Sequence, residues 1–99
     1  TNSIKEFLQT KDIEILEELA GKPKEYHAKV RIDTLFGKQE LYLIAKDKKK
    51  ITEDDLAIAL HKAQSEKMPA YILTQGDIDK TAKPFLDSWK NLLKFEKLK

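Results

Sequence analysis

The run Leu41-Tyr42-Leu43-Ile44-Ala45 is apolar at every position. Because successive side chains of a strand point to opposite faces of its sheet, this run predicts a central strand that is covered on both faces. Residues 26–33, which precede it, alternate between apolar and polar side chains and predict a strand that is covered on one face. A short turn around Gly37 connects the two runs, so we expect an antiparallel hairpin.

A helix start follows the hairpin. Thr52 stands three residues before Asp55, which is the spacing of a capping box. Ile51 and Leu56 match the hydrophobic staple that often accompanies such a box. The apolar run 70–74 then predicts a third strand, and a helix between two strands of one sheet implies a right-handed crossover and a parallel pair.

Both ends of the chain have helical spacing. Residues 3–6 form a second capping box, and the apolar residues after it predict helix as far as residues 21–23, with a break at residues 10–12 allowed. Apolar residues from Ile78 to Leu93 keep one helical phase across Pro84 and predict one kinked helix or two helical pieces stacked in line, with Trp89 in the core. The predicted order is therefore α-β-β-α-β-α, a small three-layer α/β sandwich around a mixed sheet.

Composition narrows the class of protein. A length of 99 residues suits one domain, and a first residue other than methionine suggests a fragment of a larger protein. Without cysteine there are no disulfides or thiolate metal sites, and His27 and His61 alone cannot form a zinc site. The absence of a signal peptide or a membrane-length apolar run predicts a cytoplasmic protein without membrane contact. We expect no cofactor and no small-molecule substrate, and the Lys- and Glu-rich composition resembles that of heat-adapted proteins.

The hairpin whose second strand ends at Lys46, the helix after it and the strand at 70–74 resemble the PD-(D/E)XK superfamily, the restriction-endonuclease-like fold. In active members an aspartate on the first strand and a Glu-x-Lys on the second gather a divalent metal, which activates water. Lys46 matches the lysine, but the glutamate position falls on Ile44. The aspartate is expected near residues 28–30 (Ala28, Lys29 and Val30), none of which is acidic, and Asp33 lies toward the turn.

The resemblance therefore implies a degenerate member of the superfamily, with no catalytic residue and no metal ligand. One alternative stays open, because some nucleases of this fold carry an acid on the following helix. Glu53, Asp54 or Asp55 could then restore a metal site, although helix capping explains these acids more simply.

Lysines surround the position at which the resemblance places the catalytic site. With a net charge of only +2, any affinity for nucleic acid must come from such local clusters. The basic residues predicted to bind nucleic acid are Lys29, Arg31, Lys46, Lys48, Lys49 and Lys50. His27 lies on the polar face of the first strand with Lys29 and Arg31 and belongs to the same basic patch.

The leading hypothesis is a non-catalytic nuclease-fold module that docks on nucleic acid, preferably DNA, within a larger DNA- or RNA-processing or transcription assembly. The alternative is a protein-interaction or assembly domain that uses an open sheet edge or the lysine-rich last helix with Phe95 and Leu98. A third hypothesis is a metal-dependent nuclease with a relocated acid. A protein partner or further domains of the parent protein are expected in the first two cases.

Overall fold

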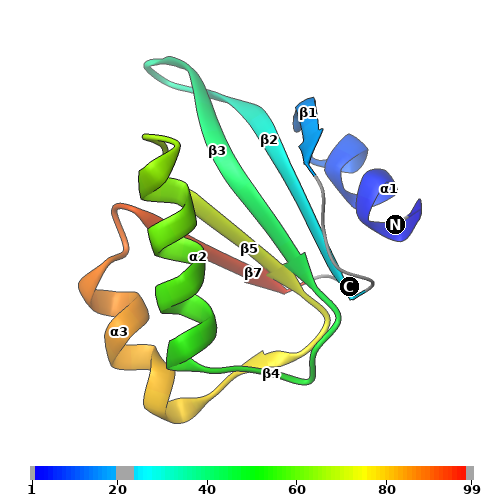
Figure 1. The fold of residues 1–99 in the computed structure, drawn as a ribbon. Helices are drawn as coiled ribbons and strands as arrows, with labels where there is room; N and C mark the ends of the chain where they lie inside the picture. Colours follow the sequence, from blue (N-terminus) through cyan, green and yellow to red (C-terminus); the bar gives the residue numbers. More distant parts are fainter. Residues whose placement is uncertain (1, 20–23, 98–99) are drawn as a thin grey trace.

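The computed structural model describes residues 2–19 and 24–97, which build a five-stranded sheet of order β1-β2-β3-β5-β7 (Figure 1). The strands of this sheet are β1 (Glu14–Leu19), β2 (Glu25–Thr34), β3 (Gly37–Lys46), β5 (Ala70–Thr74) and β7 (Leu93–Lys97). A separate two-stranded ladder joins β4 (Lys50–Ile51) to β6 (Asp77–Ile78). The helical segments are α1 (Asn2–Thr10), α2 (Glu53–Ser65), the 3-10 turn η1 (Lys80–Ala82) and α3 (Lys83–Ser88).

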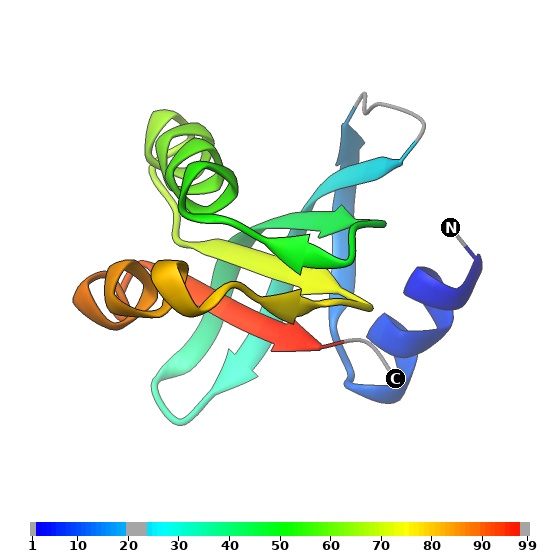
Figure 2. The same ribbon diagram turned by 90° about the horizontal axis from the view of Figure 1, so that it is seen from below.

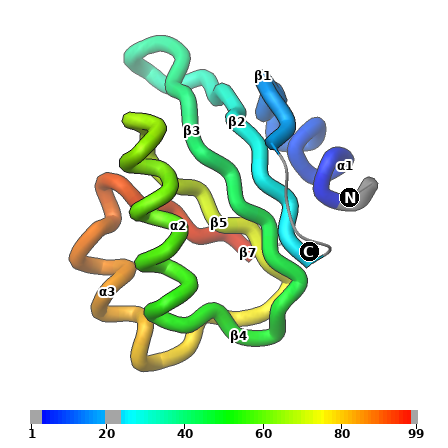
Figure 3. The backbone as a smooth tube through the Cα atoms, viewed as in Figure 1, coloured from blue at the N-terminus to red at the C-terminus, as the bar shows by residue number. Residues whose placement is uncertain are grey.

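The predicted hairpin is confirmed. Strands β2 and β3 pair antiparallel along their full length, from Thr34 opposite Gly37 to Glu25 opposite Lys46. Gly37 has a φ of 109°, a conformation that side-chain-bearing residues rarely adopt, and this lets the two strands turn back tightly. The hairpin turn projects beyond the other elements, as the backbone tube in Figure 3 shows.

The central strand and the helix after it are also as predicted. Strands β3 and β5 are parallel, and α2 connects them through the β4 segment. The Thr52 side chain accepts a hydrogen bond from the Asp55 amide, and the Asp55 carboxylate accepts one from the Thr52 amide, so the capping box is complete. Ile51 and Leu56, the expected staple, are both fully buried.

Helices lie on both sides of the sheet, as the view from below in Figure 2 shows. On one face, α2 and α3 pack over a core that includes Tyr42, Ile44 and Leu56. On the other face, α1 contributes Leu8 to a second core with Leu43 and other odd-numbered β3 residues. The central strand β3 is therefore buried on both faces, which explains why all of residues 41–45 are apolar.

The prediction for the chain start was wrong in its second half. Helix α1 ends at Thr10, Asp12 adopts a positive φ of 57°, and residues 14–19 form the edge strand β1 instead of helix. The expected stop at residues 21–23 lies outside the described residues, as does the Ser3 side chain of the expected capping box.

The prediction for the last segment, one kinked helix or two helical pieces in line, was right for residues 80–88 and wrong for the rest. Segment 77–97 instead forms β6, η1, α3 and then β7, which pairs parallel with β5. Trp89 and Leu92 remain 40% and 38% exposed rather than entering the core, whereas Leu93 is buried. None of the described helices combines the length and the apolar composition that a bilayer crossing requires.

Candidate nucleic-acid interface

Three neighbouring parallel strands end at the same edge of the sheet. Lys46 of β3 is in register with Thr74 of β5, and Thr74 is in register with Lys97 of β7. In open α/β sheets, ligands bind outside the carboxyl ends of the strands. This edge is therefore the first place to look for a site. Its centre is a group of five polar side chains, here called the Lys46 cluster: Glu25, His27, Lys46, Lys48 and Asp55.

Strand β2 contributes Glu25 and His27 to the Lys46 cluster. The hairpin register places Glu25 opposite Lys46 and His27 opposite Ile44, so all four side chains share one face. Glu25 Oε1 lies 3.1 Å from His27 Nε2, and Glu25 Oε2 lies 3.8 Å from Lys46 Nζ. His27 is buried and its Nδ1 shares a 3.2 Å hydrogen bond with the Tyr42 hydroxyl.

Helix α2 contributes Asp55 through the capping box at its first turn. The Asp55 carboxylate lies 3.2 Å from Lys46 Nζ and 2.6 Å from Lys48 Nζ, and it accepts a 2.9 Å hydrogen bond from the Thr52 amide. Burial favours the neutral form of Asp55, but the hydrogen bonds from Lys48, Thr52 and Lys46 outweigh it and lower the pKa of Asp55 to about 2. Asp55 is therefore a fixed, buried anion between two lysines.

The lysine-rich turn after β3 is held in place by backbone contacts. The buried Thr74 hydroxyl donates a 3.0 Å hydrogen bond to the Lys48 carbonyl and accepts one from the Gly76 amide. The Asp77 amide donates a 2.9 Å bond to the Lys49 carbonyl. A Cβ atom at Gly76 would overlap the Lys48 and Lys49 carbonyls, so only glycine fits there. The turn therefore presents Lys48, Lys49 and Lys50 from a fixed backbone.

The structure divides the predicted binding residues into two groups. Lys29 and Arg31 lie on β2, where Lys29 forms a 2.7 Å ion pair with Glu66 and Arg31 one with Glu14. These two cations are neutralised within the fold. Lys46 is largely buried in its cluster, whereas Lys48, Lys49 and Lys50 are exposed at the carboxyl edge.

Sequence reasoning missed two other lysines at this edge. The ion pair with Lys97 and the further fields of Lys50 and Lys83 lower the pKa of Asp77. These three lysines therefore lie near one carboxylate. The wrong prediction of a last helix hid Lys97, because only pairing of β7 with β5 brings it to this edge.

The hairpin register shows which acids of β2 lie near Lys46. Glu25, one residue before the predicted strand, is the acid opposite Lys46, whereas Ala28 lies opposite Leu43 and Asp33 lies at the hairpin turn. On the helix, Asp55 enters the site, while Glu53 and Asp54 are exposed.

The acids of the Lys46 cluster are paired with cations. Lys46 Nζ lies 3.8 Å from Glu25 and 3.2 Å from Asp55, and Lys48 Nζ lies 2.6 Å from Asp55. Ile44, at the glutamate position, is buried in the core and offers no oxygen. Among residues 2–19 and 24–97, no three His, Asp or Glu side chains are grouped closely enough to hold a metal ion.

Comparison with solved structures agrees with this fold. A chain of the MspJI restriction endonuclease, solved in complex with a 27-mer oligonucleotide, matches with a TM-score of 0.57 at 8% sequence identity. The match covers 97% of this chain but 24% of the MspJI chain, so the present chain spans about a quarter of that protein. The likeness concerns the fold alone and is compatible with a restriction-endonuclease-like α/β domain. No protein-family model and no curated protein matches the sequence.

Proposed function

We propose that this domain docks on nucleic acid, with DNA preferred, through the carboxyl edge of its sheet and does not cleave it. The observation that carries the proposal is the charge-balanced Lys46 cluster, which lies at the carboxyl edge of the sheet behind exposed lysines on a fixed turn. The structural neighbour was solved with an oligonucleotide, which is consistent with this class of partner.

Two features support the absence of catalysis. Ile44 replaces the acid that the superfamily pattern places two residues before the lysine, and it is packed into the core beneath α2. The carboxylate of Asp55 already accepts hydrogen bonds from Lys46, Lys48 and the Thr52 amide. This pairing of Asp55 with Lys46 and Lys48 supports the proposal of a non-catalytic, degenerate member of the restriction-endonuclease-like fold.

Positive charge on a fixed backbone supports docking. Lys49 and Lys50 are exposed, and Lys83 and Lys97 lie around Asp77 beside them. Phosphate contacts by such lysines release counterions from nucleic acid and so contribute affinity without sequence specificity. Because the turn is already ordered, binding loses little backbone entropy.

Fluorescence anisotropy with labelled single- and double-stranded DNA, at two salt concentrations and with magnesium, tests the proposal. We expect binding that weakens as salt rises. The double variant Lys49→Ala/Lys50→Ala leaves the Lys46 cluster intact, and it should lower the salt dependence by about two phosphate contacts. The variant Lys38→Ala/Lys90→Ala makes the same charge change at the opposite end of the strands and should bind as the unchanged protein does.

Three results would count against the proposal. Absence of binding at low salt removes nucleic acid as the partner of this domain. Equal weakening by the two double variants shows that overall charge, rather than this edge, drives binding. A shortened DNA probe after incubation shows cleavage, and loss of that cleavage in Lys46→Ala would favour the nuclease with a relocated acid.

A further inference from the structure

The two edges of the five-stranded sheet differ. Strand β1 is irregular, with a register shift between Ile15 and Glu17, and it carries Glu14, Glu17 and Glu18. Bulges and charges of this kind protect an edge against pairing with another chain. Strand β7 pairs regularly with β5, and no other strand of the described chain pairs with its second side. The β7 edge is thus a regular strand edge, and its charged residues, Lys94, Glu96 and Lys97, are of both signs rather than of one sign.

The hydrogen bonds between β5 and β7 define which residues of β7 have unpaired backbone N–H and C=O groups. The Ala70 amide donates a 2.8 Å hydrogen bond to the Leu92 carbonyl, and Ala70 lies opposite Leu93. In a parallel ladder, alternate residues bond to the same neighbour, so Lys94 and Glu96 direct their N–H and C=O groups toward β5. Leu93, Phe95 and Lys97 therefore direct theirs toward the open edge.

We infer that β7 pairs antiparallel with β7 of a second copy of this chain, about a two-fold axis at Phe95. In that register Leu93 of each copy lies opposite Lys97 of the other, and both use their outward N–H and C=O groups. Lys94 then lies opposite Glu96 in a closely spaced, non-hydrogen-bonded pair, and the symmetry creates this opposite-charge pair twice. The strand is complementary to itself, which is why a second copy is the occupant.

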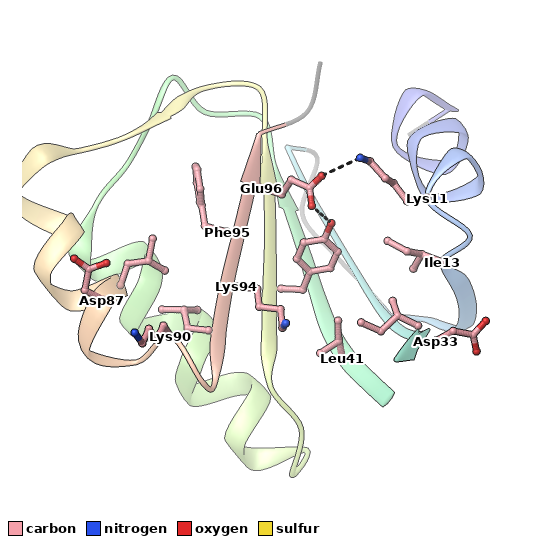
Figure 4. Close-up of a pocket in the computed structure, with 13 residues that line it drawn as sticks. Lys11, Ile13, Asp33, Leu41, Asp87, Lys90, Lys94, Phe95 and Glu96 are labelled. Atoms are coloured by element: carbon pink, nitrogen blue, oxygen red, sulfur yellow. Dashed lines mark hydrogen bonds and ion pairs between the residues drawn. The ribbon is translucent and has the colours of Figure 1, made fainter. Parts of the chain in front are cut away.

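The surface beside β7 supports the same arrangement. A groove of about 620 Å³ adjoins β7, and its lining includes Lys94, Phe95 and Glu96 on the strand and Lys11, Ile13 and Leu41 across the sheet (Figure 4). Glu96 lies 40% exposed, accepts a hydrogen bond from the Tyr71 hydroxyl and forms a 3.7 Å ion pair with Lys11. A carboxylate accepts about four hydrogen bonds, so Glu96 retains capacity for Lys94 of the second copy. The exposed Trp89 and Leu92 add apolar area beside the edge.

Sedimentation equilibrium over a range of concentrations, without nucleic acid, tests the inference independently of the proposed function. The unchanged chain should reach twice its monomer mass. Lys94→Glu places a glutamate opposite Glu96 of the second copy at both symmetric positions. This repulsion should raise the dissociation constant about 10-fold. Glu96→Lys should do the same, and mixing the two variants should restore association, because each glutamate then faces a lysine.

Two controls make the test specific. Lys97→Pro removes an outward N–H without changing a bond to β5, and it should weaken association. Phe36→Ser changes a side chain that is 99% exposed at the hairpin turn, away from β7, and it should leave association unchanged. A monomer at about 1 mM would overturn the inference, as would association lost in Phe36→Ser or not restored in the mixture. Circular dichroism confirms that each variant is folded.

Discussion

Asp55 serves the fold and the candidate interface with the same two oxygens. Its Oδ2 accepts hydrogen bonds from the Thr52 amide and Lys48, and its Oδ1 accepts one from Lys46. These contacts cap α2 and also pair Asp55 with both lysines of the Lys46 cluster. A single residue therefore connects helix stability to the arrangement of that cluster.

The lowered pKa of Asp55 predicts how stability depends on pH. Because the pKa falls from 3.8 to about 2 on folding, Asp55 stabilises the protein above pH 3.8 and loses this contribution as pH falls toward 2. Asp55→Asn should lower the free energy of unfolding at pH 7 by about 2 kcal/mol and flatten the acid limb of the stability curve. Urea unfolding at a series of pH values measures both effects.

Asp54→Asn is the matched control, because Asp54 is exposed in the same first helical turn. It should change the free energy of unfolding by less than about 0.5 kcal/mol. Equal effects of the two variants across the pH series would show that general helix-terminus charge, rather than the Lys46 cluster, is responsible.

At the residue scale, local signals were predicted and cross-strand partners were not. The capping box of Thr52 and Asp55 is a short-range pattern, so sequence alone revealed it. Glu25 was missed because its role depends on the hairpin register, which places it opposite Lys46, 21 positions along the chain. His27 likewise shows its role only through Tyr42 and Glu25, which bury and satisfy it.

Among the elements, the β4–β6 ladder fixes the lysine-rich turn. The closest approach of the backbones is at Gly76, against the Lys48 and Lys49 carbonyls. Gly76→Ala would force the Lys48 and Lys49 carbonyls to move, because the added Cβ overlaps them. We expect a loss of about 2 kcal/mol in the free energy of unfolding. Thermal and urea unfolding measure it, and the exposed neighbour Gln75→Ala should change little. Unchanged stability in Gly76→Ala would contradict the close approach of these backbones.

Sequence reasoning identified the elements whose pattern of buried and exposed residues can be recognised within a single segment of the chain. Strands β2, β3 and β5 and helix α2 belong to this group. Strands β1 and β7 lie at the sheet edges; the apolar residues of β1 also fit a helical spacing, and Leu93 at the start of β7 continues the helical spacing of the residues before it. Pairing with β2 and β5 decides their conformation, and such long-range pairing leaves no clear local signal.

For the whole molecule, the two proposed surfaces meet at Lys97. The carboxyl ends of β3, β5 and β7 carry Lys46, Thr74 and Lys97, and the outward backbone groups of β7 belong to Leu93, Phe95 and Lys97. Pairing of two copies through β7 would extend one continuous sheet and place two carboxyl edges in one assembly. Docking on nucleic acid and pairing of the domain are therefore compatible.

The central claim is that nucleic acid docks at the carboxyl edge without being cut. An NMR titration of the isotope-labelled chain with a short DNA duplex and magnesium tests it most directly, because it locates contacts residue by residue. We predict chemical-shift changes at Lys48, Lys49, Lys50 and around Asp77, none at the hairpin turn, and a duplex of unchanged length afterwards. Changes centred on the hairpin turn or on β1, or a shortened duplex, would contradict the claim.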